Sequence, residues 1–79
     1  MDPEKVKELI ESGMSAEHVT VTGDGAHFEA VIVSYEFQGK NLVQRHQVVY
    51  GALGDAMRED IHALSMKTYT PEQWKEINN

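Results

Sequence analysis

The chain has 79 residues, of which 41% are hydrophobic and 25% are charged, a composition typical of one small globular domain and not of a disordered tail. It contains no cysteine, which excludes disulfides, thiolate catalysis and a metal site built from the chain's own thiolates. No apolar run approaches the ~20 residues that a membrane span needs. The N-terminus is acidic where a secretory signal would be basic, so we expect a cytoplasmic protein.

The formal net charge of −6 is concentrated in the first half of the chain. Residues 1–36 carry eight acidic side chains and two lysines, whereas residues 37–79 carry five side chains of each sign. In the second half, Lys40, Arg45 and His46 form one weakly basic stretch with no acid between them. Three such groups fall short of the basic face of a dedicated nucleic-acid-binding protein, and the net negative charge repels a phosphate backbone.

The first helix is predicted over residues 3–12, because a capping aspartate and a first-turn proline precede an apolar stripe. Two strands are then predicted over residues 18–22 and 28–37, where apolar and polar residues alternate. The segment Gly23-Asp24-Gly25 between them tolerates positive φ angles and is typical of a hairpin turn.

A helical pattern follows Asn41, a suitable N-cap. Its inward-facing stripe consists of Leu42, His46, Val49 and Leu53. Gly51 and Gly54 lie within this pattern, which continues to about residue 57. Because each glycine costs roughly 1 kcal/mol relative to alanine inside a helix, we predict two shorter helices joined by a turn, similar to a helix-turn-helix pair.

A third strand is predicted over residues 61–68, with His62, Leu64 and Met66 on one face. A capping threonine, a first-turn proline and a capping-box glutamine then predict a short terminal helix that carries Trp74 and Ile77. The order is therefore αββααβα, which places the chain in the α/β (α+β) class as a single domain, residues 1–79. Since helices connect the second and third strands, those strands can be parallel, which gives a three-stranded mixed sheet packed with helices.

The four histidines are the best candidate metal ligands in a chain without cysteine. His27 heads the second strand after the turn, where a binding role and an ordinary surface position both stay open. His62 leads the third strand, where it is either a core histidine or a ligand offered at the strand end. We interpret His46 as core packing and His18 as an ordinary surface residue. No two histidines have the spacing of a metal-binding motif, and no enzyme signature is present, so we predict neither a complete intrachain metal site nor an enzyme.

Several segments, read together, resemble the BolA family. They are Phe37–Lys40, Val43–Tyr50, Ile61–Lys67 and Thr70–Trp74, which occur in the family's order and spacing within a match from about Val6 to Trp74. The sequence Gly23–Phe28 is similar to that of the short bacterial BolA-like subgroup. The resemblance implies a fold related to the class II KH domain, in agreement with the predicted order.

The resemblance also implies a function in iron–sulfur cluster trafficking, iron homeostasis and the stress response. BolA-like proteins pair with monothiol glutaredoxins and share a [2Fe-2S] cluster with them. The family's ligand histidine falls on His62. In some members a second ligand comes from the loop between the first two strands; Asp24 occupies the family's cysteine position here, and His27 is the nearest imidazole. Glutaredoxin and glutathione would supply the sulfur ligands, so the chain alone would hold no cofactor and would be a monomer or weak homodimer.

The competing function is DNA-binding transcriptional regulation, because some family members are described as transcription factors and the central helices resemble a helix-turn-helix pair. Lys40, Arg45 and His46 would then carry the contacts. The related KH domains bind nucleic acid through a GXXG loop, and this sequence contains no such tetrapeptide. We therefore expect a non-enzymatic partner of glutaredoxin with at most weak DNA binding.

Overall fold

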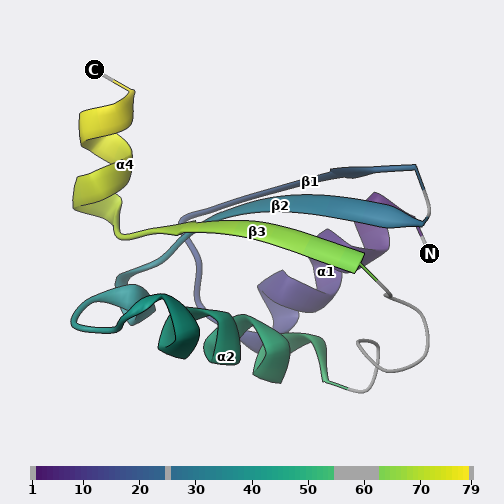
Figure 1. Cartoon of the computed structure of the whole chain (residues 1–79), viewed down its shortest axis with the longest axis horizontal. Helices are drawn as coiled ribbons and strands as arrows, with labels where there is room; N and C mark the ends of the chain where they lie inside the picture. The colour runs from purple at the N-terminus through teal and green to yellow at the C-terminus, as the bar shows by residue number, and fades with distance from the viewer. Residues whose placement is uncertain (1, 25, 55–62, 79) are drawn as a thin grey trace.

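The computed structural model describes residues 2–24, 26–54 and 63–78 of the chain. The predicted order agrees with the structure, which is an α+β fold of helices and a three-stranded mixed sheet (Figure 1). The second central helix that the sequence predicts, up to about residue 57, lies outside the described residues. The described elements are α1 (Pro3–Gly13), β1 (His18–Gly23), β2 (His27–Val33), the 3-10 helix η1 (Tyr35–Phe37), α2 (Leu42–Leu53), β3 (Ala63–Tyr69) and α4 (Pro71–Ile77).

The strands lie in the order β1-β2-β3, with β2 in the middle. The hairpin strands β1 and β2 are antiparallel, with His18 opposite Val33. The strands β2 and β3 are parallel, from the pair His27 and Ala63 to the pair Val33 and Tyr69. Figure 1 shows α1 and α2 on one face of the sheet, whereas α4 stands at the end of the sheet and points away from it.

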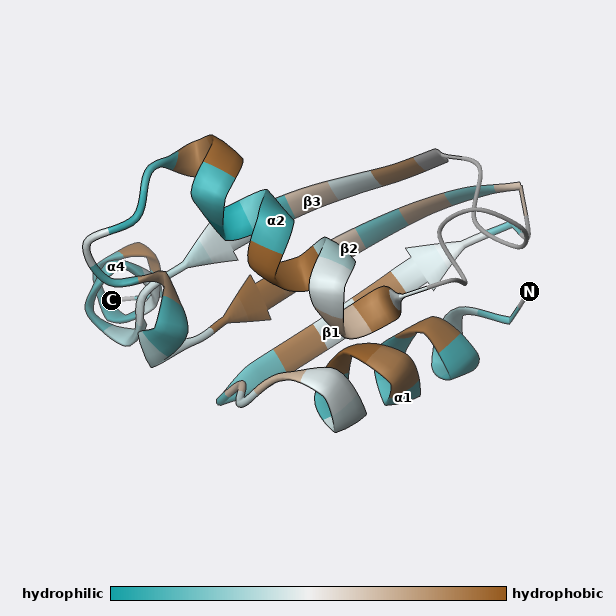
Figure 2. Cartoon of the chain, turned by 90° about the horizontal axis from the view of Figure 1, so that it is seen from below, coloured by the Kyte–Doolittle hydropathy of each residue, from teal (hydrophilic) through white to brown (hydrophobic). Residues whose placement is uncertain are grey.

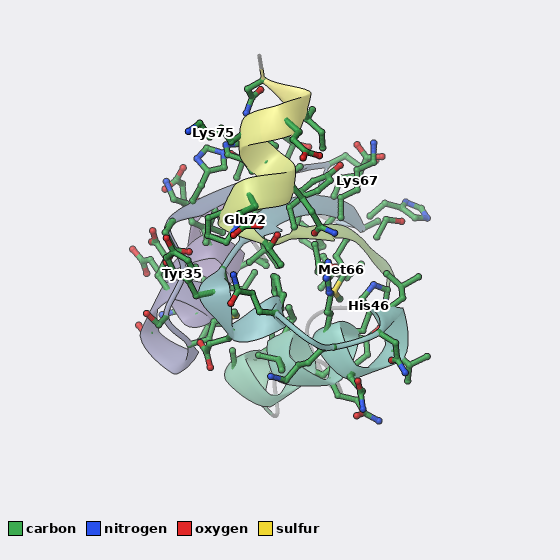
Figure 3. The ribbon with its side chains drawn as sticks, turned by 90° about the vertical axis from the view of Figure 1, so that its left-hand side faces the viewer. Tyr35, His46, Met66, Lys67, Glu72 and Lys75 are labelled. Atoms are coloured by element: carbon green, nitrogen blue, oxygen red, sulfur yellow. The ribbon has the colours of Figure 1, made fainter. Side chains whose placement is uncertain are left out.

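The core lies between the sheet and the pair α1 and α2, which lie side by side across it (Figure 2). Successive side chains of a strand point to opposite faces, so alternate strand residues reach the helices. Figure 3 shows this alternation on β3, with Lys67 above the sheet and Met66 below it on the helical side. The buried hydrophobic residues are Val6, Ile10, Met14, Val19, Phe28, Ala30, Ile32, Val33, Phe37, Val49 and Leu53.

The helix α1 forms as predicted and approaches α2 closely at its last residue. The Asp2 carboxylate accepts a hydrogen bond from the backbone N–H of Glu4 at 3.1 Å and so caps the helix. A Cβ atom on Gly13 would lie 2.6 Å from both the Cα and the carbonyl oxygen of Ala52 in α2. Glycine at this position therefore allows the two helices to pack at short distance.

The strand β2 ends at Val33, four residues before the predicted end at residue 37. The backbone turns at Ser34, whose hydroxyl accepts a hydrogen bond from the N–H of Glu36 at 3.0 Å and starts η1. This turn buries Phe37 completely and leaves Tyr35 61% exposed. The alternating pattern predicts a longer strand with Tyr35 and Phe37 on the same face. This prediction is wrong because the Ser34 side chain caps η1, which competes with continued strand pairing.

The helix α2 continues through Gly51 and ends at Gly54, which adopts a positive φ of 59° as C-cap. The predicted break therefore occurs at the second glycine only. The Asn41 cap is confirmed, with a reciprocal capping box to Gln44. Leu42 is 63% exposed and is not part of the inward stripe, because periodicity gives the direction of a side chain but not whether a partner lies opposite it.

The terminal helix α4 begins at a capping box between Thr70 and Gln73, as predicted. Trp74 is half-buried and Ile77 is exposed, and the helix contains no fully buried residue. None of the helices in the described ranges combines the length and apolarity required to cross a membrane.

Candidate functional site

His27 stands at the start of β2 with an exposed side chain, next to a turn organised by Asp24. The Asp24 carboxylate accepts hydrogen bonds from the backbone N–H groups of Ala26 and His27, both at 3.0 Å. The Asp24 N–H donates to the carbonyl oxygen of His27 at 3.3 Å. The N–H of His27, followed by that of Ala26, holds the pKa of Asp24 below its ordinary value of 3.8. The predicted hairpin turn is thus built from a carboxylate that is stabilised in its charged form.

The parallel ladder brings the beginning of β3 beside His27. The pairing partner of His27 is Ala63, the residue that directly follows His62 in the sequence. His62 itself lies outside the described residues. Of the two predicted ligands, the structure therefore describes His27 and the sequence neighbour of the other.

Within residues 2–24, 26–54 and 63–78, no three His, Asp or Glu side chains gather closely enough to hold a metal ion. The chain has no thiolate to add. A [2Fe-2S] cluster needs four ligands, mostly sulfur, so its thiolates would have to come from another molecule.

His18 lies at the opposite end of the sheet from His27 and makes contacts that its sequence context does not predict. Its ring stacks on Trp74, with centroids 5.1 Å apart and an interplanar angle of 23°. Its Nε2 atom lies 2.8 Å from the hydroxyl of Thr20. The stacking partners are 56 positions apart in the chain, so no local pattern could reveal the contact.

His46 is half-buried on α2, on the helical side of the sheet (Figure 3). Its Nε2 atom is enclosed and has no hydrogen-bond partner among the described residues. Its ring meets that of Tyr50 edge-on, with centroids 6.3 Å apart. These surroundings agree with a packing role for the imidazole.

Lys40 and Arg45, the other members of the weakly basic stretch, donate to carbonyl oxygens. The ammonium of Lys40 donates to the carbonyl of Glu36 at 2.7 Å. The Nε of Arg45 donates to the carbonyl of Lys40 at 3.0 Å, and Nη1 donates to the carbonyl of Thr68 at 3.2 Å and to Oε1 of Gln73 at 3.0 Å. Arg45 therefore ties α2 to the end of β3 and to α4, a structural role that the sequence pattern did not indicate.

Comparison with known proteins gives a consistent family match. The sequence model of one family, described as BolA-like protein, matches residues 1–73. The acid stress protein IbaG of Escherichia coli (strain K12) is 36% identical over 75 residues, which cover 94% of this chain and 89% of the relative. The DNA-binding transcriptional regulator BolA of Vibrio cholerae is 38% identical over 76 residues, which cover 96% and 69%. A solved bolA protein homologue from Coxiella burnetii superposes with a TM-score of 0.87 at 46% identity, over 95% of this chain and 97% of that chain.

Proposed function

We propose that this chain, which belongs to the BolA family, is a non-enzymatic accessory protein that binds a monothiol glutaredoxin and contributes imidazole ligands to a [2Fe-2S] cluster in transit. His62 is the principal ligand and His27 the secondary one. The proposal rests on the parallel pairing of His27 with Ala63, the residue next to His62 in the chain. This pairing brings His27 beside the sequence neighbour of the other candidate ligand.

The chemistry of the chain makes a partner necessary for this function. Without cysteine, the chain offers only the nitrogen share of a cluster's ligands, and the glutaredoxin cysteine and a glutathione thiol supply the sulfur. Imidazole in place of thiolate on one iron raises the reduction potential of a [2Fe-2S] centre. The exposed side chain of His27 is available to a docked partner without any rearrangement of the core.

DNA-binding regulation is the second candidate function, favoured by the name of the Vibrio cholerae relative. The side chains that would contact phosphate are poorly placed for it in this chain. Lys40 and Arg45 donate to backbone carbonyls, and the net charge is −6. We therefore rank this function below cluster ligation.

The experiment that tests the proposal mixes the purified chain with a cluster-loaded monothiol glutaredoxin and records ultraviolet-visible and circular-dichroism spectra. Mixing should change the cluster spectrum, because an imidazole replaces another ligand on one iron. The variant His62→Ala should abolish this change, and His27→Ala should weaken it or make the cluster more labile. The variant His18→Ala is the matched control, since His18 pairs with Val33 at the other end of the sheet.

A folded His62→Ala protein that still gives the full spectral change would overturn the assignment. Thermal melting followed by far-ultraviolet circular dichroism shows whether each variant is folded, and His62→Gln is a second variant of similar size. Metal binding needs neutral imidazole, so the mixed complex should also loosen as the pH falls through the ordinary histidine range near ~6.5. A spectrum unchanged down to about pH 5, with the cluster of glutaredoxin itself intact, would contradict imidazole ligation.

A further inference from the structure

The face of the sheet opposite α1 and α2 is open over most of its length. Among the elements that the structure describes, only α4 reaches this face, at the end of the sheet away from His27 (Figure 1). The ring of Trp74 there lies between the rings of His18 and Tyr69, with centroids 5.1 Å and 5.5 Å apart. Val33, which pairs with both of these residues, is buried. The free part of the open face therefore runs from α4 to His27.

A hollow of about 260 Å³ occupies this free part of the face, and all three strands line it. Five of its side chains are exposed and polar, and the sixth is a half-buried valine. Figure 3 shows Lys67, one of the six, above the sheet on the same side as α4. We call this the open-face hollow, and its side chains are those of Thr20, Thr22, Glu29, Val31, Ser65 and Lys67.

His27 lies on the same face as the open-face hollow and at its border. The next residue, Phe28, is buried in the core, so alternation directs His27 and Glu29 to the open face. Two residues along a strand span about 7 Å, which places Glu29 close to His27, and Ser65 pairs with Glu29. In the other direction, β2 begins at His27 and the turn of Asp24 precedes it. A partner that reaches the imidazole of His27 therefore comes from the open side of the sheet.

The size of an ordinary protein interface brings the open-face hollow under any partner docked at His27. A specific interface buries about 800 Å² on each partner, which is a patch about 30 Å across. With a rise of about 3.3 Å per residue and a strand spacing of about 4.8 Å, every residue that lines the hollow lies within about 15 Å of His27. A patch of this size that includes His27 therefore covers the hollow, because the sheet offers no surface beyond its own end.

The charges of the open-face hollow fit a protein surface better than a polyanion. Glu29 and Lys67 are exposed, and neither forms an ion pair within the part of the chain that the structure describes. Each is therefore available to a group of opposite sign on another molecule, whereas a phosphate backbone would be repelled by Glu29. The hydroxyl groups of Thr20, Thr22 and Ser65 both donate and accept hydrogen bonds, so they suit the mixed polar groups of a protein.

We propose that the partner that carries the cluster docks on the open face of the sheet, over the open-face hollow, and that a basic and an acidic side chain of this partner pair with Glu29 and Lys67. The inference rests on the proposed function, because it is His27 as a ligand that brings the partner to this face. Val31 is the only aliphatic side chain among the six that define the hollow. Such a surface lacks the apolar centre of a permanent interface, so the complex forms and dissociates readily, as the delivery of a cluster requires.

The first test measures the Kd for an immobilised, cluster-loaded monothiol glutaredoxin by biolayer interferometry. The charge reversals Glu29→Lys and Lys67→Glu should each raise the Kd by about ten-fold or more, because like charges that face each other across an interface repel strongly. The matched controls Glu8→Lys and Lys5→Glu change exposed residues of α1, on the other face of the sheet, and should leave the Kd unchanged. At saturation, both hollow variants should reach the cluster spectrum of the parent, since their histidines are intact.

The second test needs no variant and compares two exposed lysines of the parent chain. Brief acetylation with an amine-reactive ester, read by mass spectrometry of peptides, should slow at Lys67 when cluster-loaded glutaredoxin is added. Acetylation of Lys5 on α1 should proceed at the same rate with and without the partner.

The two measurements separate failure of the docking face from failure of the proposed function. A parent that binds glutaredoxin without any change in the cluster spectrum would contradict ligation by histidine. Equal Kd values for the parent and both hollow variants, or acetylation of Lys67 that the partner does not slow, would overturn docking on the open face even where the spectrum changes. Protection of Lys67 that grows with the concentration of the chain alone would assign the hollow to a second copy and would likewise overturn the proposal.

Discussion

Asp24 sets the conformation of the turn that presents His27, through two hydrogen bonds to its carboxylate. The sequence predicts the turn correctly, but it assigns the glycines to positive φ angles. Gly23 has no positive φ, and glycine is needed there because a Cβ atom would lie 2.5 Å from the carbonyl oxygen of His27. At this position close approach of the backbone, and not a left-handed conformation, selects glycine.

The turn should be sensitive to acid. Because the folded state lowers the pKa of Asp24, the carboxylate contributes stability that is fully present above its ordinary value of 3.8 and is lost as the pH falls through the lowered pKa. Amide chemical shifts of Ala26 and His27 should therefore move in that acidic range in the parent. The variant Asp24→Asn keeps an acceptor oxygen without the titrating charge, so these shifts should not move in it. The same titration in Asp24→Asn would exclude this carboxylate as the cause.

At the scale of the secondary-structure elements, two helical glycines form a matched pair for substitution. Gly13 lies at the contact between α1 and α2, and Gly51 lies on an open face of α2. Gly13→Ala places a methyl group against the backbone of Ala52, and overpacking of this kind costs about 1–3 kcal/mol. Gly51→Ala lies inside α2 with open space around the new methyl group, so it should stabilise the protein by about 0.5–1 kcal/mol through helix propensity.

Urea denaturation followed by circular dichroism measures both changes as shifts in the unfolding midpoint. The two variants should move the midpoint in opposite directions, although each replaces a helical glycine by a better helix former. A stabilised Gly13→Ala protein would mean that α1 and α2 separate easily at this point.

The elements with strong local signals could be predicted from the sequence, whereas their ends and contacts could not. The N-cap Asn41 before α2 and the capping box before α4 are visible as residue types at fixed positions, and the structure confirms both. The end of β2 at Val33 and the exposure of Leu42 depend on what lies opposite each residue in space. The stacking of His18 on Trp74 and the links of Arg45 to Thr68 and Gln73 join distant segments, and such contacts have no local pattern. For the candidate site, the sequence predicts the strand positions of both histidines, and the register adds that the neighbour of His62 pairs with His27.

For the whole molecule, the charge distribution predicts weak binding to nucleic acid. Binding of a DNA duplex should be weak, detectable only at low salt and lost as salt is added, because it would depend on a few electrostatic contacts to phosphate and the net charge is −6. Fluorescence anisotropy with a labelled duplex at several salt concentrations measures this dependence. A sequence-specific complex at about 150 mM salt with a Kd of ~10⁻⁸ M or tighter would place DNA regulation above cluster ligation.

The mixed sheet also has a consequence for the order in which the protein folds. The hairpin of β1 and β2 closes across a short turn, and isolated hairpins form within about 1–10 μs. The parallel ladder instead joins His27 to Ala63, 36 positions away, and non-local pairing of this kind is slow because loop-closure entropy is lost before the contacts form. During synthesis, β2 therefore has no parallel partner until β3, which begins at Ala63, has emerged. The end of the sheet that we assign to cluster ligation is therefore assembled late. Because a nascent or partly unfolded chain lacks the pairing of His27 with Ala63, we expect it not to compete with the folded protein for a cluster.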